Sequence, residues 1–155
     1  MSALPSQSRY IIGTEACERF SFYGMKSILM LYMTGHLLMS DNWATSTLHI
    51  FVGMVYLLPL AGAWLADKVW GRYKTILYIS LLYCVGHGVL ATADLFHTIE
   101  ARRYILMAGL FIIALGAGGI KPCVSAFMGD QIPNKSPQLM TKAFNAFYWA
   151  INLGS

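Results

Sequence analysis

Four charged side chains lie within one apolar stretch of the sequence, residues 13–33. They are Glu15, Glu18, Arg19 and Lys26. In an α-helix of 3.6 residues per turn, their spacing places all four within an arc of about 100°. An ionised side chain near the middle of a bilayer is disfavoured by about 2.5–3.5 kcal/mol unless it faces a wet cavity or opposite charges. Two carboxylates and two cations on one face are therefore candidates for moving protons and binding a charged solute.

The rest of the chain decides whether this stretch is a soluble amphipathic helix or a membrane helix. Apolar residues make up 57% of the sequence and charged residues 12%, against about 25% charged in a soluble domain. Residues 43–66, 75–93 and 104–120 contain no Lys, Arg, Asp or Glu. Since a bilayer core needs roughly 20 helical residues, each run predicts a membrane span, and residues 13–33 belong to a fourth.

We therefore predict an all-α membrane protein with spans at about 10–39, 45–66, 75–94 and 104–128. A fifth apolar helix starts at 141–155 and is too short for a complete span. The chain is thus expected to be a fragment. The first ten residues contain no apolar segment of the kind that a signal peptidase removes, so the first helix is expected to be retained.

The basic residues indicate how the chain is oriented. With the N-terminus inside, six basic residues lie at the inner ends of the helices, two lie in outer loops and three lie within the membrane. The six inner residues are Arg9, Lys68, Arg72, Lys74, Lys135 and Lys142; the two outer residues are Arg102 and Arg103; the three within the membrane are Arg19, Lys26 and Lys121. This asymmetry predicts a multi-pass protein of the plasma (cell inner) membrane with a cytoplasmic N-terminus. It also argues against nucleic acid as a partner.

Two single residues within predicted spans have alternative interpretations. His49 is either a hydrogen-bonded interior residue or a proton relay. Lys121 either reaches the interface from a helix that ends at Ile120, or lies about two turns inside the membrane. Because residues 122–128 continue apolar, we favour the second position and a functional role.

Residues 62–76, GAWLADKVWGRYKTI, combine small residues with charges. Gly62 allows close helix contact, and Gly71 permits a tight turn. The stretch resembles the loop signature of the major facilitator superfamily, which implies a cytoplasmic gate formed by Asp67, Arg72 and Lys74. In the alternative interpretation the loop only sets the membrane topology. That would explain its basic residues but not the ordered Gly, Asp and Gly.

Nothing in the sequence predicts an enzyme. We find no nucleophile–base pair, no cluster of metal ligands and no phosphate-binding loop. The three cysteines are expected to be small packing residues; they are Cys17, Cys84 and Cys123. The glycines at 116–119 are expected to allow close helix packing. No cofactor is expected apart from protons as the coupling ion.

Four motifs in order resemble the proton-dependent oligopeptide transporter family. They are ExxERFxFYG at 15–24 followed by Met25 and Lys26, the stretch 62–76, GAGGIKPCVSAFMGDQ at 116–131 and FNAFYWAINLGS at 144–155. The resemblance implies two six-helix halves of the major facilitator fold around a central site. This chain would supply helices one to four and the start of the fifth, and the C-terminal half would be absent.

The resemblance also implies a role for individual residues. Glu15, Glu18 and Arg19 would couple proton movement to peptide binding, and His49 matches a histidine linked to this coupling. Lys26 and Lys121 would hold the peptide carboxylate, and Tyr23, Tyr56 and Asn152 would line the peptide pocket. Lys26 replaces a common arginine and loses its bidentate fork. Phe22 replaces a common tyrosine and lacks its hydroxyl.

The function implied is proton-coupled symport of di- and tripeptides, although the fragment alone is expected to be inactive. Two alternatives stay open. One is a transporter of the same fold for another small solute, such as nitrate. The other is a non-transporting membrane scaffold or truncated fragment, which would leave the charges within the membrane unexplained.

Overall fold

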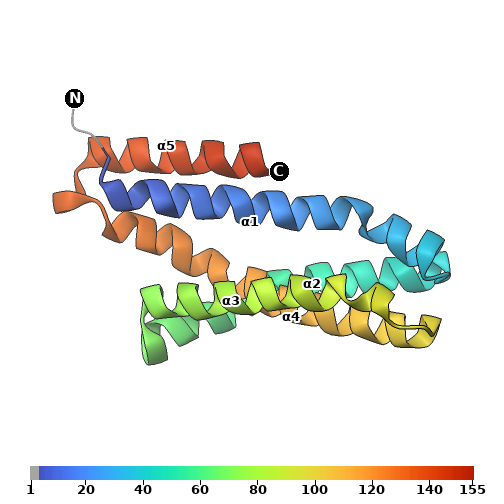
Figure 1. The fold of residues 1–155 in the computed structure, drawn as a ribbon. Coiled ribbons are helices and arrows are strands. Elements are labelled where there is room, and N and C mark those ends of the chain that lie inside the picture. The colour runs from blue at the N-terminus through green and yellow to red at the C-terminus, as the bar shows by residue number, and fades with distance from the viewer. Residues whose placement is uncertain (1–3) are drawn as a thin grey trace. The chain divides into compact units, whose positions relative to one another are not determined.

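The computed structural model describes residues 4–155, apart from the side chain of Lys135. In this part of the chain every regular element is a helix (Figure 1). The long helices are α1 (Ser6–Leu31), α2 (Asp41–Leu65), α3 (Arg72–Ala91), α4 (Ile99–Asp130) and α5 (Pro137–Gly154). Short helical turns connect them: η1 (Tyr32–His36), η2 (Ala66–Trp70), η3 (Ala93–Leu95) and η4 (Pro133–Lys135). The prediction of an all-α fold is confirmed for these residues.

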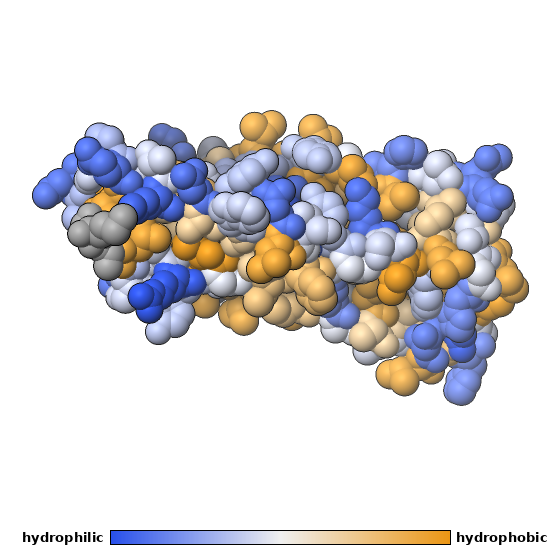
Figure 2. Space-filling view, turned by 90° about the horizontal axis from the view of Figure 1, so that it is seen from above, coloured by the Kyte–Doolittle hydropathy of each residue, from blue (hydrophilic) through white to orange (hydrophobic). Residues whose placement is uncertain are grey.

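Three of these helical segments are long and apolar enough to cross a membrane. They are Asp41–Trp70, Arg72–Leu95 and Ile99–Asp130. Helix α1, which carries the four charges, is not among them. Large hydrophobic side chains reach the surface in broad patches (Figure 2), and on α2 they include Leu57, Leu60 and Trp64. Such exposure is expected where helices face lipid rather than water.

The chain forms two compact units. One combines the N-terminal part of α1, up to Ser27, with Val124–Ser155, and the other is Ile28–Cys123. In the first unit α5 runs along α1 (Figure 1). A Cβ added at Gly154 of α5 would lie only 2.7 Å from the Cβ of Arg19 on α1. This position therefore needs glycine for the two helices to approach so closely.

In the second unit α4 packs against α2 and α3 through its glycines. A Cβ added at Gly62 would lie 2.6 Å from Gly119 Cα, and one at Gly116 would lie 2.7 Å from Tyr83 Cα. Both separations are too short for a real Cβ. The predicted role of these glycines in close helix packing is confirmed.

Two helix boundaries differ from the predicted ones. The first helix ends at His36 instead of about Met39, and Leu38 has a left-handed backbone with φ of 51°. Helix α2 starts at Asp41, before the predicted Thr45, since the Ser40 side chain accepts a hydrogen bond from Trp43 N at 3.4 Å and caps it. Between η2 and α3, Gly71 has φ of 76°, so its predicted role in the turn is confirmed.

Candidate functional site

The first unit contains a buried ion triad on α1. Arg19 Nε lies 3.3 Å from Glu15 Oε1, and Arg19 Nη2 contacts Glu18 Oε2. Each of the three residues is at most 8% exposed. The spacing of the sequence predicts that these side chains share one face, and the structure brings them together. One guanidinium thus forms ion pairs with two carboxylates, so the triad carries one net negative charge when both carboxylates are ionised.

The remaining predicted residues of the first unit are Tyr23, Lys26 and Asn152. Tyr23 is exposed and its ring meets that of Phe22 edge to face at 5.5 Å. Lys26 is half-buried, and among residues 4–155 it has no ion-pair partner. The Asn152 amide donates to Tyr148 O of its own helix at 2.7 Å. The roles of Tyr23, Lys26 and Asn152 in binding a peptide stay predictions.

The second unit places Lys121 against an aromatic ring. Lys121 Nζ lies 5.0 Å from the centroid of Tyr56, within the range of a cation–π interaction. Helix α4 continues through Lys121 to Asp130, which excludes the interpretation that the helix ends at Ile120. His49 is exposed on α2, seven residues before Tyr56, so both lie on one helical face. Its role as a proton relay stays a prediction.

The predicted gate residues lie around the turn between α2 and α3. Asp67 is exposed in η2, and Arg72 and Lys74 belong to the first turn of α3. Thr75 Oγ1 donates to Gly71 O at 2.8 Å and Thr75 is fully buried. The Thr75 hydroxyl therefore stabilises the turn from within the unit. Asp67 and Lys74 are exposed, whereas Arg72 is half-buried.

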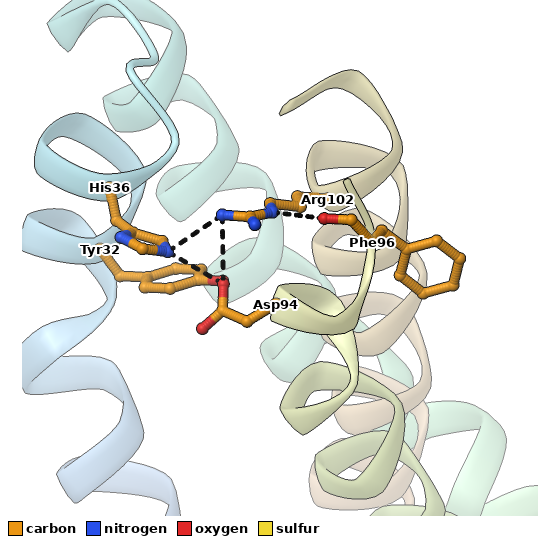
Figure 3. Close-up of polar contacts among 5 residues, drawn as sticks. All are labelled: Tyr32, His36, Asp94, Phe96 and Arg102. Carbon is orange, nitrogen blue, oxygen red and sulfur yellow. Dashed lines mark hydrogen bonds and ion pairs between the residues drawn. The ribbon is translucent and has the colours of Figure 1, made fainter. Parts of the chain in front are cut away.

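A polar cluster that the sequence did not predict lies at the opposite end of the second unit. It consists of Tyr32 and His36 of η1, Asp94 of η3 and Arg102 of α4 (Figure 3). Tyr32 Oη donates to Asp94 Oδ1 at 2.9 Å, and His36 Nε2 lies 2.9 Å from the same oxygen. These pairs are separated by about 60 residues in the chain, so no local pattern could have shown them.

The neighbouring Arg103 closes the end of η1. Its Nε and Nη2 donate to Leu37 O at 3.0 and 2.8 Å, and Nη2 also donates to Leu38 O at 2.7 Å. The guanidinium lies over the Trp43 ring at 5.2 Å. From the sequence alone, Arg102 and Arg103 were interpreted only as part of the unequal distribution of basic residues between the two sides of the membrane. The structure shows that they connect α4 to the end of the first helix.

A groove of about 320 Å³ lies between α2, α3 and α4 in the second unit. Its lining is apolar and includes Leu65, Trp70 and Leu115. None of the residues predicted to bind a peptide lines this groove. Cys123, near its floor, is buried and donates to Gly62 O at 3.7 Å, whereas Cys17 and Cys84 are exposed.

A membrane helix with a buried ion triad is typical of proteins that move ions or solutes through a bilayer. The comparison with protein families identifies the class more closely. The sequence model of the POT family matches residues 73–155, which is more than half of the chain. The chain belongs to the POT family, and it is a multi-pass membrane protein.

The relatives most similar in sequence include transporters from animals. Peptide transporter family 1 of Drosophila melanogaster is 47% identical over 153 residues, which are 97% of this chain and 20% of that protein. Solute carrier family 15 member 2 of Homo sapiens is 42% identical over 156 residues, which are 99% of this chain and 21% of that protein. The chain thus spans about a fifth of the length of these relatives.

Solved structures share the fold. The crystal structure of the POT family transporter PepTSo matches with a TM-score of 0.88 at 48% identity, over 99% of this chain and 30% of that one. A POT family transporter in complex with a thioalcohol conjugated peptide matches with a TM-score of 0.85 at 28% identity, over 97% of this chain and 30% of that one.

Proposed function

We propose that this chain forms the first four spans and the start of the fifth span of a proton-coupled symporter of di- and tripeptides. The observation that carries the proposal is the buried Glu15–Glu18–Arg19 triad, in a chain of the POT family. Relatives that are 40–47% identical include a protein named peptide transporter family 1 and members of solute carrier family 15. The remaining spans of such a transporter would supply the other wall of the site.

The triad is the proposed proton site. Glu15 and Glu18 are buried and share Arg19 as their cation. Any further charge that comes near the triad changes which protonation state of the two carboxylates is favoured. Protonation of Glu18 or Glu15 would leave a neutral pair with Arg19, at a smaller cost of burying charge. His49 is proposed as a second group on the proton path, since imidazole titrates in the physiological range.

The peptide carboxylate is proposed to bind the two lysines, Lys26 and Lys121. Lysine binds an anion as a compact charge with rotatable donors, and the Tyr56 ring holds the ammonium of Lys121 in place. Tyr23 and Asn152 are proposed to line the pocket. Binding of the carboxylate to the lysines would change the charge near the triad and shift its proton equilibrium, which couples the two solutes.

The orientation and the gate belong to the same proposal. With the N-terminus in the cytoplasm, Asp67, Arg72 and Lys74 would lie at the cytoplasmic face, where they would open and close the path. The polar cluster of Tyr32, His36, Asp94 and Arg102 would then lie at the outer face. The support is the excess of basic residues at the ends assigned to the inside.

Replacement of Glu18 by Gln tests the proposal. The longest open reading frame that contains this chain is reconstituted in liposomes with an acidic exterior, and accumulation of a labelled dipeptide is measured. We expect Glu18→Gln to abolish accumulation driven by the proton gradient while dipeptide exchange across the membrane continues. The matched control is Glu100→Gln, which changes an exposed carboxylate and should leave accumulation intact. Undiminished accumulation with Glu18→Gln would refute the assignment of the triad to the proton.

A further inference from the structure

The polar cluster joins three helical segments through one carboxylate oxygen. Asp94 Oδ1, on η3, accepts a hydrogen bond from Tyr32 Oη and lies 2.9 Å from His36 Nε2 (Figure 3). Arg102 Nη1 lies 3.9 Å from the same oxygen and 3.4 Å from His36 Nε2. The His36 ring is also stacked on Tyr32, with centroids 5.1 Å apart. The end of the first helix is therefore attached to the α3–α4 connection mainly through Asp94.

The position of one proton follows from this geometry. A bare Nε2 lone pair at 2.9 Å from a carboxylate oxygen would place two acceptors against each other, so Nε2 carries a proton and donates to Asp94. That proton is present in the neutral imidazole as well as in the imidazolium. Acidification therefore changes the charge of the ring without changing its hydrogen bond to Asp94.

Arg102 does not cancel the effect of this added charge. Its Nε donates to Phe96 O at 2.7 Å, which holds the guanidinium beyond hydrogen-bond distance of Asp94. The His36 and Asp94 side chains are 49% and 56% exposed, so the high dielectric constant of the surrounding water weakens the repulsion between the two cations. Protonation turns the bond from a neutral donor to the Asp94 carboxylate into an ion pair with both partners charged, and this pair is closer than the contact between His36 and Arg102.

The backbone beside the cluster is unusual and depends on side-chain support. Residues 32–36 form a π-helical turn, in which Leu37 N donates to Tyr32 O at 3.0 Å. Leu38 has a left-handed conformation, which is strained for a side chain branched beyond Cβ. Arg103 binds the carbonyls of Leu37 and Leu38. Turns of this kind are frequent at sites that change conformation.

We propose that the cluster is a pH-sensitive attachment, in which protonation of His36 binds the end of the first helix more firmly to the α3–α4 connection. The charged and titratable groups that face the ring are Tyr32 of η1, Asp94 of η3 and Arg102 of α4, and Arg103 binds the adjacent backbone. That the cluster faces the acidic side of the membrane rests on the proposed orientation. The pH sensitivity itself does not depend on transport.

A double-mutant cycle tests the attachment on the protein from the complete open reading frame, purified in lipid nanodiscs. The variants are His36→Gln, Asp94→Asn and the pair, and the thermal midpoint is measured at about pH 5.5 and about pH 8, on either side of the imidazole titration. We expect His36→Gln to lower the midpoint by about 1–3 °C more at the lower pH. In the Asp94→Asn background this difference should vanish, because asparagine can still accept a hydrogen bond but has no negative charge to attract a protonated His36.

Two further variants keep the test decisive. His97→Gln changes an exposed histidine of the same connection and should show no pH-dependent loss. Arg102→Gln removes the competing cation and should enlarge the pH-dependent part of the His36→Gln effect. Equal losses for His36→Gln at both pH values, or a pH-dependent loss that persists with Asp94→Asn, would overturn the proposal. Because no transport is measured, the proposed function can fail independently.

Discussion

At the residue scale, the triad on α1 is the arrangement that the sequence predicts best. Glu15 and Arg19 are one helical turn apart, so their contact follows from helix geometry alone. Burial of all three side chains could not be predicted in the same way, since it depends on distant parts of the chain, such as Gly154 of α5, which packs against Arg19. A helical periodicity determines which side chains share a face, but not what covers that face.

Loss of the shared cation should destabilise the protein strongly. We expect Arg19→Leu to lower the free energy of unfolding by about 3–5 kcal/mol, because two buried carboxylates lose their counter-ion. Thermal unfolding in nanodiscs measures the effect. The control Arg9→Leu removes an exposed arginine of the same helix and should change the free energy by less than about 0.5 kcal/mol. Equal effects of the two variants would contradict a buried triad that depends on Arg19.

The contact between Tyr56 and Lys121 should influence peptide affinity. A cation–π contact contributes about 0.5–2 kcal/mol, so we expect Tyr56→Leu to raise the KM for a dipeptide about 2- to 30-fold. Tyr56→Phe retains the ring and should recover most of this affinity. Uptake by reconstituted protein measures both variants. If Tyr56→Phe raises the KM as much as Tyr56→Leu does, the hydroxyl and not the ring face determines the affinity for the dipeptide.

The polar cluster shows where reasoning from the sequence stops at this scale. Tyr32, His36 and Asp94 have no shared periodicity, and the partners are about 60 residues apart. The one available signal was a pair of arginines at the start of a helix, after a loop with an aspartate. Such a pair is common near membrane ends, so it indicates topology more readily than a specific contact.

At the element scale, glycine contacts determine how close α2, α3 and α4 lie. The sequence predicts these contacts because glycine clusters in an apolar helix have few other uses. It does not predict which glycine meets which residue. That pairing, Gly62 on Gly119 and Gly116 on Tyr83, depends on the relative shift of the helices along their axes.

Filling one of these contacts should destabilise the second unit. We expect Gly62→Ala to lower the free energy of unfolding by about 1–3 kcal/mol, since the new methyl group would meet the backbone of Gly119, which cannot move aside. Gly53→Ala is the matched control, because it lies on the same helix with nothing within 4 Å of the added Cβ. The control should be neutral or slightly stabilising. If Gly62→Ala left the free energy of unfolding unchanged, α2 and α4 would have to lie further apart than the structure places them.

The helix ends were harder to predict than the helices. The turn at Gly71 was recognised from a local rule, since only glycine adopts its φ of 76° without strain. The end of the first helix was placed about three residues too late, near Met39. Here Leu38 adopts a positive φ, and bonds from the distant Arg103 support that conformation.

At the scale of the whole molecule, composition and motif order were enough to predict the family and the fold class. The roles of single residues stay predictions, because they depend on binding and transport and not on the fold alone. The division into spans also stays a prediction, although a helix overlaps each of the predicted ranges. The two compact units are each defined by contacts between residues far apart in the sequence, which no linear pattern expresses.

The orientation can be tested directly by cysteine labelling. In a variant without Cys17, Cys84 and Cys123, a cysteine is placed at Asn42 or at Gln138, both of which are exposed. With a cytoplasmic N-terminus, we expect a membrane-impermeant maleimide added to whole cells to label Asn42→Cys only. Gln138→Cys should react after the cells are opened. The reverse pattern would place the N-terminus outside.

The glycine contacts of α4 also matter while the protein is being made. Helices α2 and α3 are synthesised first, yet the surfaces at Gly62 and Tyr83 that should meet α4 have no protein partner until Gly119 has left the ribosome. At about 5–20 residues per second, this interval lasts a few seconds. During this time the hairpin of α2 and α3 would sit beside the translocon with lipid in place of α4, open to misassembly or to protection by an insertion chaperone.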